Sequence, residues 1–216
     1  MGKLDASEEK ENRDAEYHRR IQTAAARLLE QNGIDSVNMY QIAQEAGIGQ
    51  GTLYRRYEHP GEIYSEMLRN STEQILGELE AEADQFRAAD ASASALDQLE
   101  HVLSRLFDYV DSQIELLTSI SCMYAGKKNF LPHKRPITVR LYGILNVYLV
   151  LAAERREVRD IDVTLTSNFL MAVLSPEQYM YHRDSLGYTK EQYLAGIRSL
   201  YIEGIRAPKV KAEPAE

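Results

Sequence analysis

The sequence has little cysteine, no tryptophan and few of the residues that interrupt helices. Its 216 residues include 1 Cys, 6 Pro and 12 Gly. A single cysteine excludes an intramolecular disulfide framework and a zinc site built on cysteines, because both need several sulfur atoms. The small number of prolines and glycines, together with the lack of alternating β-branched runs, favours an all-α protein.

The chain also lacks an apolar leader and a long apolar run. Its first residues, MGKLDASEEKENRDAEYHRR, are charged throughout, which is not typical of a signal peptide. The longest apolar run, Leu141 to Ala153, contains Gly143 and Asn146 and is too short to cross a bilayer. We therefore expect a cytoplasmic protein with no membrane partner.

Basic residues are fewer than acidic residues in this chain. The chain has 25 Lys and Arg against 33 Asp and Glu, which gives a net charge of -8. Spread evenly, this balance would argue against a nucleic-acid partner. However, acidic residues predominate from Glu73 to Glu115, whereas basic residues gather at 18–20, at 55–56 and over 126–159. The acidic and basic segments either pair, admit an anionic effector at the loop 127–136, or are solvated faces.

The first third of the chain predicts four helices. Apolar residues from Ile21 to Leu29 recur at helical spacing, and Gly33 ends this first helix. Asn38 and Gln41 have the spacing of a capping box, which starts a second helix that runs to about Ala46. We expect a third helix over 50–57, with Leu53 facing inward, and a fourth that begins at Pro60 and runs toward residue 79.

The remainder also has helical periodicity. Stripes of apolar residues predict helices over 96–110, 114–123, 137–156 and 162–174. Capping-box spacing at 175–178 and 189–192 predicts two further helix starts, of which the second opens a helix over 190–205.

The layout of the second and third helices is that of a helix-turn-helix. A short helix whose N-terminal end carries small and polar residues fits a major groove, because bulk there would keep the backbone away from the base edges. Residues 50–56, QGTLYRR, have this character apart from the inward Leu53.

The segment IQTAAARLLEQNGIDSVNMYQIAQEAGIGQGTLYRRYEHPGEIYSEML resembles the DNA-binding domain of TetR-type transcriptional regulators over about residues 17–68. The resemblance implies a dimeric repressor that places its third helix in the major groove of double-stranded operator DNA. It implies base contacts from Gln50, Gly51, Thr52 and Arg55. It implies phosphate contacts from Asn38, Tyr40, Gln41, Tyr54 and Arg56.

Two positions depart from the family pattern. Gly49 stands where the family usually has Ser or Thr, and Pro60 stands where it usually has Lys at the start of the fourth helix. We expect weaker phosphate anchoring, with His59 as a substitute contact. The alternative for Tyr54 and Tyr57 is a core role, which we favour for Tyr57, and the alternative for the two arginines is a solvated face.

The C-terminal part of such regulators holds a ligand pocket and a dimer interface. Here 14 Tyr and polar groups within apolar helices predict an effector pocket, and Asn146 is the best candidate because a buried amide needs a partner. The candidate ligand-binding residues are Phe107, Met123, Tyr124, Tyr142, Asn146 and Phe169. A two-fold dimer is expected because one short helix reads too few base pairs. Its candidate interface is Phe169, Tyr193, Ile197, Leu200 and Tyr201. The alternative for these apolar side chains is an ordinary core.

Catalysis is not expected. The sequence has no HExxH, GxSxG, P-loop or dinucleotide-binding pattern, and its 5 His lack the spacing of metal ligands. We expect no catalytic residues, no metal site and no cofactor. The expected domains are a disordered tail (1–14), a helix-turn-helix domain (15–62), a helical effector-binding and dimerisation domain (63–206) and a C-terminal tail (207–216). The rival function is a helical adaptor that binds protein rather than DNA.

Overall fold

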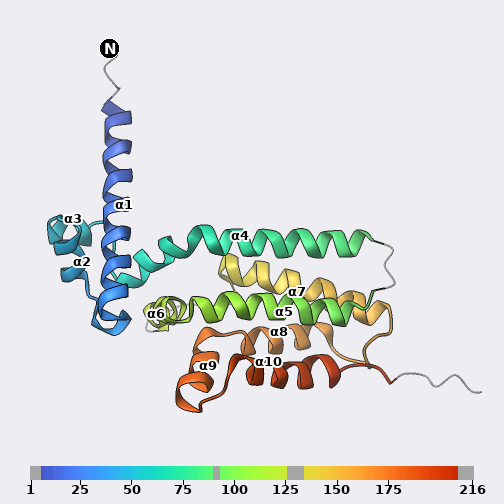
Figure 1. The fold of residues 1–216 in the computed structure, drawn as a ribbon. Helices are drawn as coiled ribbons and strands as arrows, with labels where there is room; N and C mark the ends of the chain where they lie inside the picture. The colour runs from blue at the N-terminus through green and yellow to red at the C-terminus, as the bar shows by residue number, and fades with distance from the viewer. Residues whose placement is uncertain (1–5, 90–92, 126–133, 209–216) are drawn as a thin grey trace, which may run out of the picture. The chain divides into compact units, whose positions relative to one another are not determined.

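The computed structural model describes residues 6–89, 93–125 and 134–208, and these residues are predominantly helical. Figure 1 traces the helices in chain order. No β-strand occurs within these ranges, where Val158 and Arg206 form one isolated antiparallel bridge. The all-α prediction is confirmed.

The first four helices are α1 (Ala6–Asn32), α2 (Met39–Glu45), α3 (Gln50–Tyr54) and α4 (Pro60–Ala88). Their boundaries follow the local signals: Gly33 has a φ of 72°, and Asn38 and Gln41 form the capping box. The α-helical part of α3 is shorter than predicted and ends at Tyr54, with Arg55 as its C-cap.

Two of these helices are longer than the sequence predicted. α1 begins at Ala6, inside the segment expected to be a tail, and Asp14 from this segment pairs with Arg56. α4 runs past residue 79 to Ala88, because Leu79 and Ala83 continue its buried face. In both cases tertiary contacts extend a helix beyond its sequence pattern.

The later helices are α5 (Ala95–Ser112), α6 (Ile114–Ala125), α7 (Pro136–Glu154), α8 (Val163–Val173), α9 (Pro176–Met180) and α10 (Lys190–Arg198). The Thr189–Gln192 capping box is present, and the Ser175 side chain accepts from the Gln178 backbone N–H. The last predicted helix is α-helical only to Arg198 and continues as a π-helical turn to Glu203.

The chain divides into two compact units that are not contiguous in sequence. One holds the chain up to Ser71 together with α6 from Glu115, and the other holds Thr72–Ile114 and the chain after α6. The boundary expected between residues 62 and 63 thus differs from the structural one, which lies within α4. The difference arises because α6 contributes Ile120 to the core formed by α1–α3 and the start of α4.

α7 is the most apolar long helix. By length and composition it is the one helix in the described part of the chain that could cross a membrane. In its unit, however, it packs against α5 and α8 and buries Ile144, Leu145, Tyr148 and Leu149. These contacts cover one face of α7, since 28% of its most apolar stretch is buried and Val139 is exposed.

Candidate nucleic-acid interface

The short helix α3 has one face in the core and the other in solvent. Leu53 is fully buried, whereas Gln50, Gly51, Tyr54 and Arg55 are exposed and Thr52 is half-buried. Gly49 caps the helix without a side-chain hydrogen bond. The residues predicted to reach DNA from this helix therefore lie away from the core, which leaves them available to a groove.

The N-terminus of α2 presents a second set of predicted contacts. Tyr40 and Asn38 are exposed and Gln41 is half-buried. The Gln41 backbone N–H donates to Asn38 Oδ1 at 3.1 Å, and the Asn38 N–H donates to Gln41 Oε1 at 3.0 Å. These two hydrogen bonds complete the capping box and order the start of α2.

The turn between α2 and α3 is held by an arginine that the sequence analysis did not single out. Arg20 Nε donates to the Ala46 carbonyl at 3.1 Å, and its Nη2 donates to the Ala46 and Gly47 carbonyls at 2.6 and 2.9 Å. Gly47 has a φ of +62°, and a Cβ there would lie 3.0 Å from Arg20 Nη2. The turn thus requires glycine at position 47 for its backbone conformation, and Arg20 supplies hydrogen bonds to its carbonyl groups.

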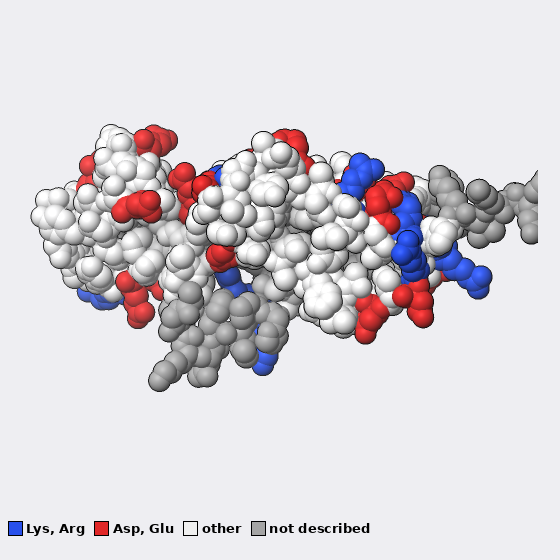
Figure 2. Space-filling model, turned by 90° about the horizontal axis from the view of Figure 1, so that it is seen from below, with Lys and Arg blue, Asp and Glu red and all other residues white. Residues whose placement is uncertain are grey.

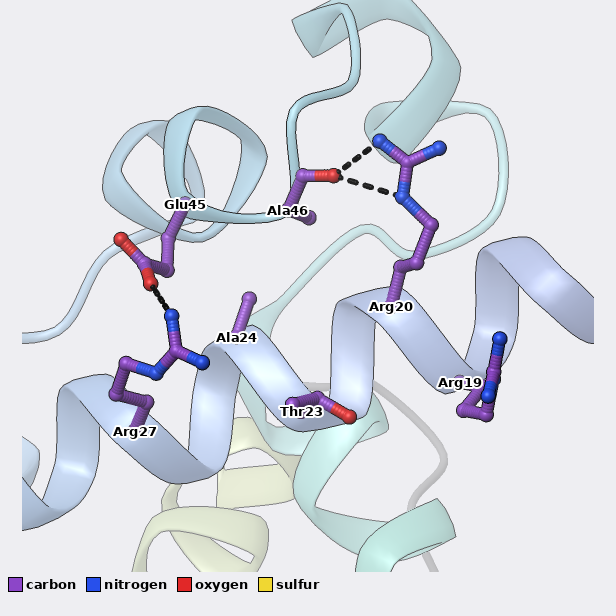
Figure 3. A pocket seen from close by; sticks show the side chains of 7 residues that line it. All are labelled: Arg19, Arg20, Thr23, Ala24, Arg27, Glu45 and Ala46. Atoms are coloured by element: carbon purple, nitrogen blue, oxygen red, sulfur yellow. Dashed lines mark hydrogen bonds and ion pairs between the residues drawn. The ribbon is translucent and has the colours of Figure 1, made fainter.

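A pocket of about 310 Å³ lies beside this turn, between α1 and the end of α2. Figure 3 shows Arg20 bound to Ala46 and Arg27 to Glu45, the latter at 2.6 Å. Thr23 and Arg19 complete the α1 wall of the pocket. Two of its three guanidinium groups are therefore engaged within the protein.

Arg56 lies in an internal ion pair, not on the free face predicted for a phosphate contact. Its Nη2 pairs with Asp14, its guanidinium lies 4.9 Å from the ring centroid of Tyr17, and its side chain is only 15% exposed. Arg55 is exposed, and its side chain has no hydrogen bond or ion pair to the residues described. Of the two arginines, Arg55 is the one free to meet DNA.

His59 caps the start of α4. Its Nδ1 accepts a hydrogen bond from the Gly61 backbone N–H at 2.9 Å, while the ring is exposed. A Cβ on Gly61 would lie 3.3 Å from Met123 Cβ, so α6 packs closely on this turn. The predicted phosphate contact by His59 must therefore use its other ring nitrogen.

A polar cluster joins three segments: α1, α4 and Tyr57, which lies three residues beyond the end of α3. Glu66 Oε2 accepts from the Tyr57 hydroxyl at 2.5 Å, from Gln22 Nε2 at 3.3 Å and from His18 Nδ1 at 3.2 Å. Burial raises the pKa of Glu66, but these hydrogen bonds outweigh it, and the net pKa lies below its usual value. The Tyr57 ring is 3% exposed, which confirms its predicted core role.

The residues predicted to bind an effector fall into both structural units. Met123 and Tyr124 lie on α6 in the first unit, whereas Phe107, Tyr142, Asn146 and Phe169 lie in the second. Phe107 is fully buried and makes edge-to-face contacts with Tyr179 and Tyr193, so it is a core residue here. Asn146 is half-buried, and its Oδ1 accepts from Ser167 Oγ at 3.3 Å.

The predicted dimer residues also separate into two groups. Phe169 on α8 and Leu200 in the turn after α10 are 55% and 67% exposed. Ile197 is 5% exposed, Tyr201 is half-buried, and Tyr193 donates to the Val173 carbonyl at 3.0 Å, so these residues mainly close their own core. Figure 2 shows that much of the surface over α9 and α10 is uncharged.

The opposite charges of the second unit pair in part. Arg140 binds Glu73 and Glu80, and Arg105 binds Glu78 and Glu82. Hydrogen bonds that Arg140 donates to Glu80 and Glu73 raise its pKa further above its usual value. Most of the basic loop 127–136 lies outside the described residues.

Sequence reasoning missed Asp14, Tyr17, Arg20 and Glu66. Each contacts a residue at least 9 positions away in the chain or a ring brought close by folding. Periodicity indicates which face of a helix is apolar, but it does not pair polar groups from different helices. The local charge at 18–20 was the one available signal for this region.

Helices α2 and α3 have the order of a helix-turn-helix, and the chain also has a second helical unit. Residues 21–59 match the family model described as bacterial regulatory proteins, tetR family. The chain is 24% identical over 203 residues to an HTH-type transcriptional regulator of Staphylococcus aureus strain MRSA252, covering 93% of this chain and 100% of that protein.

Two solved structures share the fold. A TetR-family transcriptional repressor, FadR of Thermus thermophilus, solved with lauroyl-CoA, has a TM-score of 0.57 and 18% identity, covering 92% of this chain and 100% of that one. A putative regulator of Saccharomonospora viridis, solved with choline, has a TM-score of 0.64 and 16% identity, covering 90% of this chain and 100% of that one. Residues 21–59 therefore match the model of the tetR family, and the chain as a whole is similar to regulators that carry this domain.

Proposed function

We propose that this protein is a cytoplasmic repressor that binds a palindromic operator as a homodimer and releases it when a small molecule binds. The observation that carries the DNA-binding part is α3, whose Gln50, Gly51, Tyr54 and Arg55 are exposed around a buried Leu53. The helix has the size and the polar N-terminal end that a major groove accepts.

The decisive experiment is selection of bound duplexes from random DNA by the purified full-length protein. We expect a two-fold symmetric site, because two copies of α3 in a dimer read two half-sites. Binding should weaken steeply with added salt, because neutralised phosphates release counterions. Failure to enrich any sequence, with no salt-sensitive retention on DNA, would contradict the proposal and favour the protein-binding adaptor.

Within the interface we propose a division of roles. Gln50 and Thr52 face base edges, Tyr40 and the α2 terminus hold phosphate, and Arg55 serves as the exposed cation. A Gln50→Ala change should relax sequence preference with little change in salt dependence, whereas Arg55→Ala should also reduce the salt slope if it meets phosphate. Equal and purely sequence-dependent losses would instead assign Arg55 to the bases, as the family resemblance implied.

The proposed effector site is in the second unit. The lauroyl-CoA and choline carried by two structures of similar fold support a ligand-binding role for this protein, and the two ligands are chemically unlike each other. Release requires that the effector bind the DNA-incompetent conformation more tightly. A compound that shifts the melting temperature of the protein but leaves its affinity for the selected duplex unchanged would refute effector-controlled release by that compound.

The proposed dimer surface is the exposed apolar part of α8 and the turn after α10. Phe169, Leu165 and Leu200 are the large apolar side chains exposed there. Leaving them in water is unfavourable, and a second copy would cover them with the same surface.

A further inference from the structure

The segment after α3 is hydrogen-bonded to α4 through the hydroxyl group of Tyr57. Tyr57 follows α3 by one helical turn, and its backbone N–H donates to the Leu53 carbonyl at 3.0 Å. Its ring is buried and its hydroxyl donates to Glu66 Oε2 at 2.5 Å. The segment that carries the exposed α3 face is thus held at Leu53 by packing and at Tyr57 by packing and a charge-assisted hydrogen bond.

A helix of five residues cannot set its own orientation. α3 spans Gln50–Tyr54, and isolated helices of this length are not stable in water. Apolar packing at Leu53 and at the Tyr57 ring is not directional, so by itself it allows the helix to tilt. A directional bond one turn later removes this freedom, since a hydrogen bond to a carboxylate has a preferred distance and angle.

The carboxylate that receives this bond is itself fixed from α1. Glu66 Oε2 also accepts from Gln22 at 3.3 Å, and His18 Nδ1 lies 2.7 Å from the Tyr57 oxygen and 3.2 Å from Glu66 Oε2. Because the one hydroxyl proton of Tyr57 is directed at Glu66, His18 Nδ1–H donates to the nearer Tyr57 oxygen, and Glu66 Oε2 can only share that single proton. Arg69 Nη2 adds a longer ion pair to Glu66 Oε1 at 3.7 Å.

We propose that Glu66 is a positioning residue for operator recognition, which acts through the Tyr57 hydroxyl to fix the angle at which α3 presents Gln50 and Thr52. This inference rests on the proposed function. It predicts that loss of the hydroxyl lowers discrimination between sequences, because the base-facing residues move, while retention on any DNA by phosphate contacts is kept.

The experiment compares Tyr57→Phe and Glu66→Gln with the unmodified full-length protein. Tyr57→Phe removes one oxygen and keeps the ring, so the core stays filled. The matched control is Tyr64→Phe, which also removes a buried hydroxyl, in this case one on α4. The Tyr64 hydroxyl has no hydrogen-bond partner among the described residues. Glu30→Gln, an exposed position on α1, is the control for the carboxylate.

Affinity is measured for the duplex selected by the unmodified protein and for a scrambled duplex, at one salt concentration and well below the melting temperature. We expect Tyr57→Phe to bind the selected duplex about tenfold more weakly, as loss of one charge-assisted hydrogen bond allows. Affinity for the scrambled duplex should change less than about twofold. Tyr64→Phe and Glu30→Gln should match the unmodified protein on both duplexes.

A double-variant cycle tests whether Tyr57 and Glu66 act as one unit. If they do, Tyr57→Phe combined with Glu66→Gln should weaken selected-duplex binding no more than the stronger single variant. Additive losses would overturn the coupling, and unchanged discrimination in variants that only melt earlier would overturn the positioning role. Selection of a duplex by the unmodified protein keeps these outcomes separate from a failure of the proposed function.

Discussion

Replacing Arg20 by lysine should destabilise the first unit by loosening the turn between α2 and α3. The guanidinium makes three hydrogen bonds to two carbonyl groups, at 3.1, 2.6 and 2.9 Å. Lysine keeps the charge, but its single ammonium cannot reproduce the planar fork that spans both carbonyls.

The loss in free energy of unfolding depends on how many Arg20 hydrogen bonds are removed and how well water replaces them. A hydrogen bond from a charged donor contributes about 1.5–3 kcal/mol when it is well shielded, and less when it is partly exposed. Arg20 is half-buried, and lysine retains one contact. We therefore expect the free energy of unfolding to fall by about 1–2 kcal/mol.

The matched control is Arg27→Lys, two turns along the same helix. Arg27 pairs with Glu45 at 2.6 Å, and its side chain is 58% exposed. An exposed ion pair contributes about 0–1 kcal/mol, and lysine can preserve it, so this variant should unfold like the unmodified protein.

The assay is urea unfolding of the full-length protein, with hydrogen exchange to locate the loss. Amides of residues 46–48 should exchange faster in Arg20→Lys at a urea concentration where the second unit remains folded. If Arg20→Lys and Arg27→Lys have the same unfolding midpoint and the same exchange in this turn, the clamp contributes nothing and the reasoning is refuted.

Three further predictions follow from the contacts of the described residues. Asp14→Ala should release Arg56 to solvent, strengthening non-specific DNA binding and steepening its salt slope by about 0.9 if Arg56 then reaches a phosphate; an unchanged slope in a fluorescence-anisotropy titration would exclude that contact. Because the folded-state pKa of Glu66 is lowered, its contribution to stability is present above the unfolded-state value and is lost as pH falls through the folded value. The stability advantage of the unmodified protein over Glu66→Gln should therefore shrink between pH 7 and pH values below about 4 in guanidinium unfolding, and a constant difference would contradict this. Phe169→Glu should raise the dimer dissociation constant at least about tenfold in sedimentation equilibrium, since a charge would be buried in the apolar contact; an unchanged mass would place the interface elsewhere.

Helix boundaries are the features that the local sequence predicts best. Gly33, the Asn38 capping box, Pro60 and the Thr189 capping box each act within a few residues, and the structure has each of these boundaries where the sequence predicted it. Leu53 and Tyr57 were also correctly assigned to the core from helical spacing and size. Backbone conformation and caps depend on neighbours in the chain, so they can be read without knowledge of the fold.

The partners of polar and aromatic side chains needed the tertiary structure. The sequence alone left Arg56 as a surface cation, whereas folding brings it to Asp14, 42 residues away. It likewise grouped Phe107 with Met123, although the two belong to different units, and it joined exposed Phe169 with buried Ile197 in one interface. Helical periodicity gives the apolar stripe of one helix, but which part of the stripe meets a neighbour depends on how the helices pack.

The sequence by itself therefore determined the helical class, the helix boundaries near strong caps and the presence of a short helix suited to a major groove. Only the tertiary structure decided which arginine has an unpaired side chain among the described residues. It also decided which residues hold the turn before α3 and which residues hold the segment after α3. The physical reason is the separation in sequence of the interacting residues. Caps and turns join residues a few positions apart, whereas Arg20, Tyr57 and Glu66 make contacts between different helices or segments of the fold.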